Sequence, residues 1–154
     1  MKRRALWAAC VVLLLGVGVL IVGTGFAKDD ENAGVKCSEA TLHGTYLTAY
    51  DGVDITRNEK VPFAVAEYDV FDGSGNVNGV FSGNFNGEIT RKEPYSGTYT
   101  VKADCTGTTT FNTGEKYDLF IAPDGSMYTF VQIKPSEQVA SGLELQGTAK
   151  RVAK

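Results

Sequence analysis

Histidine is nearly absent from this sequence of 154 residues, which contains only His43. One histidine and the two cysteines that lie beyond residue 27 are too few to supply the four ligands of a structural zinc site. A serine–histidine–aspartate arrangement would have to use His43, and the sequence contains no G-x-S-x-G motif. The sequence therefore predicts no metal, no cofactor and no catalytic residue, and an enzyme is the less favoured interpretation.

Long hydrophobic runs are also scarce, and the single one lies at the N-terminus. Basic residues at positions 2–4 precede a stretch without charge from Ala5 to Ala27. This order is typical of an export signal. Gly25 and Ala27 are small, as cleavage after Ala27 requires, but the run is also long enough to cross a bilayer. We predict a signal peptide or signal anchor over 1–27 and an exported remainder, which is periplasmic, secreted or anchored.

Beyond that run, basic charge is outweighed by acidic charge. The chain has 15 Lys and Arg against 18 Asp and Glu; residues 1–27 contain three of the basic residues and no acidic one, which leaves a net charge of −6. An acidic surface disfavours nucleic acid and anionic membranes as partners. Membrane contact is expected only through the N-terminal segment, if it is not cleaved.

Two cysteines remain after the signal, Cys37 and Cys105. In an oxidising compartment such a pair usually forms a disulfide. We therefore predict a Cys37–Cys105 bridge.

Sustained helical periodicity is missing after residue 27, and strand-like runs take its place. Residues 28–40 are predicted to be a flexible lead-in with one helical turn at 38–40, and residues 41–152 one β domain. The predicted strands are 42–50, 61–71, 77–86, 95–102, 105–112, 116–122, 126–134 and 139–152, with turn residues between most of them. Short connections predict an all-β, antiparallel up-and-down meander. About eight strands close best as a barrel, which removes exposed edges. The charged segment 88–93, which ends at Pro94, is predicted to be a loop or ragged arm.

Aromatic residues alternate with glycine on the predicted inward faces. Eight strands permit either a filled interior or a lumen that holds one small apolar ligand. Glycine beside aromatic residues favours the lumen, although barrel curvature alone can also require glycine. The predicted ligand-binding residues are Tyr46, Phe81, Phe85, Tyr99 and Phe111.

Two acidic residues within one predicted strand have two interpretations. Glu67 and Asp69 are two positions apart, so both point to one face. The favoured interpretation is a solvated outer face. If they face inward, they form a polar site for proton transfer or for the polar head of a ligand.

Leu42-His43-Gly44-Thr45-Tyr46 resembles the start of lipocalin-type barrels, where glycine precedes an inward aromatic residue. The resemblance implies that Arg151 packs across Tyr46, although this sequence has tyrosine where that family has tryptophan. The segments 96–101 and 104–108, with 71–75 upstream, are similar to small exported bacterial proteins of unassigned function and to allene oxide cyclase-like barrels. The resemblance spans about residues 41–152 and implies a calycin-like barrel.

The expected function is therefore non-catalytic binding of a small hydrophobic molecule in the lumen. One alternative is an interaction or structural protein of the cell envelope with a filled barrel. A second alternative is a cofactor-free cyclase or isomerase whose pocket folds a flexible substrate. The state of the lumen, empty and apolar, filled, or acidic, separates the three interpretations.

Overall fold

A computed structural model of the chain describes residues 36–56, 59–135 and 142–154, and the predicted signal at 1–27 lies outside the described residues. One short helix and eight strands follow each other: η1 (Glu39–Thr41), β1 (His43–Thr56), β2 (Glu59–Asp72), β3 (Asn76–Phe85), β4 (Glu88–Val101), β5 (Thr106–Phe111), β6 (Lys116–Ile121), β7 (Met127–Lys134) and β8 (Gly142–Ala153). Within the described residues, no helix has the length and hydrophobicity of a membrane span.

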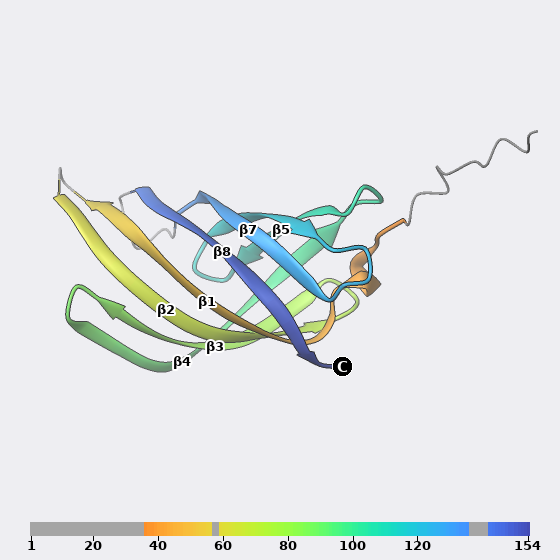
Figure 1. Cartoon of the computed structure of the whole chain (residues 1–154), viewed down its shortest axis with the longest axis horizontal. Coiled ribbons are helices and arrows are strands. Elements are labelled where there is room, and N and C mark those ends of the chain that lie inside the picture. The colour runs from red at the N-terminus through yellow and green to blue at the C-terminus, as the bar shows by residue number, and fades with distance from the viewer. Residues whose placement is uncertain (1–35, 57–58, 136–141) are drawn as a thin grey trace, which may run out of the picture. The chain divides into compact units, whose positions relative to one another are not determined.

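The eight strands form a closed antiparallel barrel in meander order (Figure 1). Each strand pairs with the next one in the chain, and β8 closes the sheet by pairing with β1 from Thr45 to Ile55. The predicted fold class is confirmed, including the single helical turn before the first strand. The first hairpin is longer than predicted, because β1 continues from the expected end at residue 50 to Thr56.

The charged segment 88–93 is the first half of β4, so of the two predictions for it the ragged hairpin arm is confirmed and the loop is wrong. The charged residues are accommodated by an irregularity: the β3–β4 register shifts between Phe81 and Gly83, and Lys92 has a φ of 55°. Pro94 is tolerated because β5 pairs with β4 only from Gly97 to Val101. The β3–β4 hairpin therefore extends past the short strand β5 (Figure 1). Pro94 lies on a local edge, because β5 pairs with β4 only from Gly97 onward.

One end of the barrel is sealed by η1 and by the disulfide between Cys37 and Cys105, which confirms the predicted pairing. The two Cα atoms are 5.0 Å apart, and the bridge closes a sequence separation of 68 residues. Beneath it Leu42 and Tyr46 are fully buried. By loop-closure entropy, a bridge of this span contributes about 4 kcal/mol to the free energy of unfolding.

Tyr46 connects three strands at this sealed end. Its hydroxyl donates a hydrogen bond of 2.5 Å to the carbonyl oxygen of Gly125, in the β6–β7 turn. Arg151 is its register partner on β8, and the arginine donates a bond of 3.0 Å to the carbonyl oxygen of Asp124 in the same turn. Burial raises the pKa of Tyr46, and the nearby Arg151 opposes that rise. The expected contact between Arg151 and Tyr46 is therefore present.

Candidate ligand-binding lumen

A cavity of about 540 Å³ occupies the barrel from its middle to the end that lies away from η1. Its inner wall is formed by residues near the η1 end, such as Phe71 and Leu119, and its outer rim by residues near the opposite turns, such as Glu88 and Thr113. The lining residues are Tyr50, Asp54, Phe63, Val65, Glu67, Asp69, Phe71, Phe81, Phe85, Glu88, Thr90, Tyr95, Thr109, Phe111, Thr113, Glu115, Tyr117, Leu119, Tyr128, Phe130 and Leu145.

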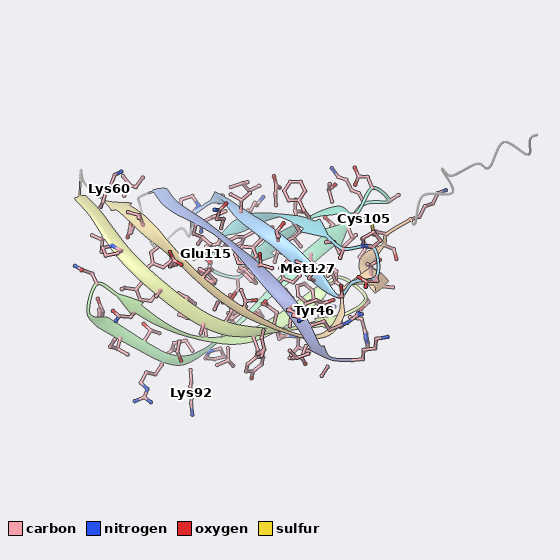
Figure 2. All side chains as sticks on the ribbon, viewed as in Figure 1. Tyr46, Lys60, Lys92, Cys105, Glu115 and Met127 are labelled. Atoms are coloured by element: carbon pink, nitrogen blue, oxygen red, sulfur yellow. A yellow bond between two sulfur atoms is a disulfide. The ribbon has the colours of Figure 1, made fainter. Side chains whose placement is uncertain are left out.

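Three of the five aromatic residues proposed as ligand contacts line this cavity, namely Phe81, Phe85 and Phe111. Tyr46 and Tyr99 do not, because they lie at the sealed end, where they are 0% and 3% exposed. Alternation along a strand gives the face of the sheet but not the depth along the barrel axis. Figure 2 shows Tyr46 nearer to η1 and Cys105, and Glu115 farther toward the opposite end.

Sequence reasoning missed four tyrosines of the lumen. Tyr117 and Tyr128 are buried at alternating positions of β6 and β7, in runs that the sequence already predicted to be strands. The same alternation would have placed both of them inward. Tyr50 and Tyr95 come from β1 and β4 and line the same space.

The aromatic side chains form a continuous arc around the wall of the lumen. Neighbouring rings along it have centroids 5.0 to 6.4 Å apart, mostly in edge-to-face geometry. The arc begins and ends on β3 and includes a residue of every strand except β8. Its members, in order, are Phe81, Tyr95, Phe111, Tyr117, Phe130, Tyr50, Phe63 and Phe85.

Glycine allows the arc to cross β8. A Cβ atom on Gly147 would lie 2.5 Å from the ring of Phe130 and 3.0 Å from Cβ of Tyr50. The rings of β7 and β1 therefore meet over a strand position that has no side chain. The same holds at Gly83, where a Cβ would lie 2.5 Å from the ring of Phe85. The space above these glycines is thus filled by neighbouring rings, and not left for a ligand as the sequence interpretation supposed.

Glu67 and Asp69 point into the lumen, so the outer face that was favoured for them is wrong. Both line the cavity; Asp69 is 2% exposed and Glu67 is half-buried. The error has a physical cause. The outward row of β2 includes Ala64, Ala66 and Val70, so it is as apolar as many core faces, and hydrophobicity could not distinguish the two sides.

Asp69 accepts hydrogen bonds from three hydroxyl groups. Tyr95 donates to Oδ1 over 2.5 Å, Tyr128 donates to Oδ2 over 2.7 Å, and Thr48 donates to Oδ2 over 3.4 Å. Gly79 separates Asp69 from Tyr95 in the sheet register, and the ring of Tyr95 fills the position where a side chain on Gly79 would lie. The missing side chain lets a tyrosine of β4 reach a carboxyl group of β2.

The protonation of this network follows from burial. Burial raises the pKa of Asp69, while the hydrogen bonds from Tyr95, Tyr128 and Thr48 oppose the rise. Burial raises the pKa values of Tyr95 and Tyr128 well above 10, so both phenols keep their protons and act as donors. Three donors around one carboxyl group favour its ionised form.

Glu67 is the protonated member of the acidic pair at neutral pH. Burial, and then the charge of Asp69, raise the pKa of Glu67 to about 8. Its neighbours are less well placed than those of Asp69: the Tyr50 hydroxyl lies 3.5 Å from Oε2. Each carboxyl group of the pair therefore disfavours ionisation of the other, and burial adds to this effect.

A third carboxyl group, that of Glu115, lies farther along the lumen. Burial raises its pKa, and the Tyr117 hydroxyl lies 3.5 Å from its Oε2 atom. Tyr117 in turn accepts a hydrogen bond of 3.1 Å from Nε2 of Gln132. Tyrosine hydroxyls thus neighbour all three of the inner carboxyl groups.

One hydroxyl group of the wall has no partner. Of the buried side-chain polar atoms in the described residues, two make no hydrogen bond, Thr109 Oγ1 and Gln132 Oε1. Thr109 is 2% exposed and lines the cavity. A buried polar atom without a partner costs about 1–3 kcal/mol of stability, so this hydroxyl is a weak point of the wall.

The lumen thus combines aromatic rings, five acidic side chains and an unpaired hydroxyl. Among the described residues, no three His, Cys, Asp or Glu side chains come together as metal ligands. Comparison with models of known protein families finds no match, and no curated protein sequence matches the chain either.

Proposed function

We propose that the protein is a non-catalytic binding protein whose lumen holds one small molecule with a ring-containing apolar body. The observation that supports this most is the cavity of about 540 Å³ inside the barrel, walled by an arc of eight aromatic rings. Ligand cavities of roughly 300–1,000 Å³ are usual in proteins, and most are apolar with a few placed polar groups. A cavity of this size favours ligand binding over the alternative function, that of an interaction or structural protein with a filled barrel.

The proposed setting is that of a calycin-like protein outside the cytoplasm. An eight-stranded antiparallel barrel with Arg151 beside Tyr46 is consistent with the lipocalin-type resemblance. The Cys37–Cys105 disulfide is typical of oxidising compartments, which supports export. Barrels of this kind host many functions, so the site and not the fold carries the proposal.

Glu67 favours a second candidate function, a cofactor-free isomerase or cyclase. A carboxyl group that keeps its proton up to a pH of about 8, inside a cavity, has the properties of a general acid. A bound molecule that is returned chemically unchanged supports the binding protein. A product whose formation is lost in Glu67→Gln supports the enzyme.

A neutral apolar dye tests the binding proposal. N-phenyl-1-naphthylamine should gain fluorescence with one site per protein, because it leaves water for an apolar lumen. Thr109→Phe places a ring inside the cavity and should abolish the gain, at a cost of about 1–3 kcal/mol in stability from overpacking. Thr98→Phe is the matched control, because Thr98 is exposed on β4. Absence of dye binding, or equal binding by folded Thr109→Phe protein, would refute the proposal.

A further inference from the structure

We propose that the ligand of this lumen carries one protonated amine, which lies between Glu67 and Asp69 while aromatic rings surround its carbon skeleton. The inference rests on the proposed function, since it names the chemical class of the molecule that the lumen binds. Three observations carry it: the sign of the charges in the wall, the arrangement of the acidic pair, and the unpaired hydroxyl of Thr109.

The charged residues of the cavity wall have one sign. Among the described lining residues there are five acidic side chains and no lysine, arginine or histidine. The acidic residues are Asp54, Glu67, Asp69, Glu88 and Glu115. An anionic ligand head would be repelled from such a wall, whereas a cation gains attraction that the low dielectric of a buried site strengthens.

The acidic pair has no basic group beside it. Glu67 is faced by Asp69 of its own strand, by Tyr50 of β1, by Tyr95 of β4 and by Glu115 next to β6, and none of these groups is basic. The positive charge of a bound ammonium would stabilise the ionised form of the Glu67 carboxyl group, so Glu67 would lose its proton. Its carboxyl O–H bond breaks, the proton leaves to solvent, and the carboxylate accepts a hydrogen bond from the ammonium N–H.

The surroundings of the pair also suit an amine. Phe81 lies opposite Glu67 in the β2–β3 register, and its ring centroid is 6.2 Å from that of Tyr95. Faces of phenylalanine and tyrosine rings attract organic cations. Thr109, whose Oγ1 is buried and without a partner, also lines this cavity. These groups provide both the attraction and the hydrogen-bond acceptors that an ammonium group requires.

Three probes with the same ring and different heads test the inference: 2-(1-naphthyl)ethylamine, 2-(1-naphthyl)ethanol and 1-naphthylacetate. At pH 7, calorimetry should give an affinity for the amine about tenfold or more above that for the alcohol, and no measurable binding of the acetate. In buffers of different ionisation enthalpy, the amine should release close to one proton and the alcohol none. Amine affinity should rise toward pH 8 and fall only as the amine itself deprotonates, at about pH 10.

Glu67→Gln keeps the side-chain size and removes the titrating group. It should bring the amine affinity down to that of the alcohol and abolish proton release, while Glu93→Gln, at an exposed position of β4, should change neither. If the alcohol or the acetate binds wild-type protein as tightly as the amine, or if amine binding releases no proton, this inference is wrong and lumen binding stands. If neither the probes nor N-phenyl-1-naphthylamine bind, the proposed function fails, and the inference fails with it.

Discussion

Tyrosine has different partners at the two ends of this barrel. At the sealed end, the hydroxyls of Tyr46 and Tyr99 donate to backbone carbonyl oxygens, those of Gly125 and of Leu42. In the lumen, the hydroxyls of Tyr95 and Tyr128 donate to a buried carboxyl group instead. The first pair fastens η1 and a turn to the strands.

The lumen pair, Tyr95 and Tyr128, acts on the ionisation of Asp69, because their hydrogen bonds oppose the rise in its pKa that burial causes. The same residue type thus supports the fold at one end of the barrel and the chemistry of a cavity at the other. What differs is the atom that each hydroxyl reaches. Substitutions at the two ends should therefore have separable effects, on stability alone at the sealed end and also on ionisation and binding in the lumen.

The largest expected effect belongs to the sealed end. Replacing both Cys37 and Cys105 with serine removes a bridge that spans 68 residues and should lower the free energy of unfolding by about 4 kcal/mol. Denaturant unfolding of the variant, compared with oxidised wild-type protein, measures the loss. Dye binding by the folded fraction should be unchanged. Loss of binding without loss of stability would contradict the separation of the two ends.

The next effect belongs to the lumen and depends on pH. The pKa of Glu67 is about 8 in the fold against 4.5 as a free side chain, so the folded state binds its proton more tightly. Stability should therefore fall as the pH rises from about 4.5 to 8, by at most about 5 kcal/mol, and by less because Glu67 is only half-buried and keeps part of its hydration. Glu67→Gln should flatten this fall. Thermal unfolding between pH 5 and pH 9 tests it, and a wild-type protein that is more stable at pH 9 would contradict it.

A smaller effect is expected at the glycine that separates Asp69 from Tyr95. Gly79→Val should push the ring of Tyr95 aside and break its bond to Asp69, at a cost of about 1–3 kcal/mol. The pKa of Asp69 should rise, because one of the donors that oppose the effect of burial is removed. Carboxyl chemical shifts followed by NMR through a pH titration would show this. The control is Ala66→Val, at an exposed position of β2. A glycine such as Gly87 would not serve, because its positive φ would add backbone strain to any substitution.

The smallest effects compare the two ends directly. Tyr99→Phe and Tyr128→Phe each remove one hydroxyl and should each cost about 1 kcal/mol of stability. Of the two, Tyr128→Phe alone should also change the titration of Asp69 and the binding of 2-(1-naphthyl)ethylamine, because the Tyr128 hydroxyl contacts that carboxyl group and the Tyr99 hydroxyl does not. Equal effects of the two variants on amine binding would show that the ends are not independent.

The strands and their order could be predicted from the sequence because their signals are local, and the disulfide because only two cysteines follow residue 27. Alternating residues and turn residues such as Pro123-Asp124-Gly125 fix where a strand lies and where it reverses. Depth along the barrel is not local, because it depends on the register of several strands. For this reason Tyr99 and Phe111, both inward, could not be assigned to the sealed end and the lumen from the sequence.

The acidic pair presents a different difficulty, because the sequence left both an outer and an inward orientation open for Glu67 and Asp69. On β2 both faces contain small or apolar residues, so the orientation of Glu67 and Asp69 could not be determined without their partners on other strands. Those partners, Tyr95 and Tyr128, come from β4 and β7. A carboxyl group that is buried because distant tyrosines bind it gives no signal within its own strand.

The contacts within the aromatic arc also reduce the conformational entropy that the wall would lose when a ligand binds. Among the described rings of the arc, each interior member contacts a ring on both sides, whereas Phe81 and Phe85 have one ring neighbour each. The two ends of the arc on β3 therefore have the fewest ring contacts, and Phe85 is 36% exposed. A molecule that passes Phe85 meets rings whose orientations were fixed when the chain folded. The ordering of the wall is thus completed before the ligand arrives, and binding does not have to oppose it.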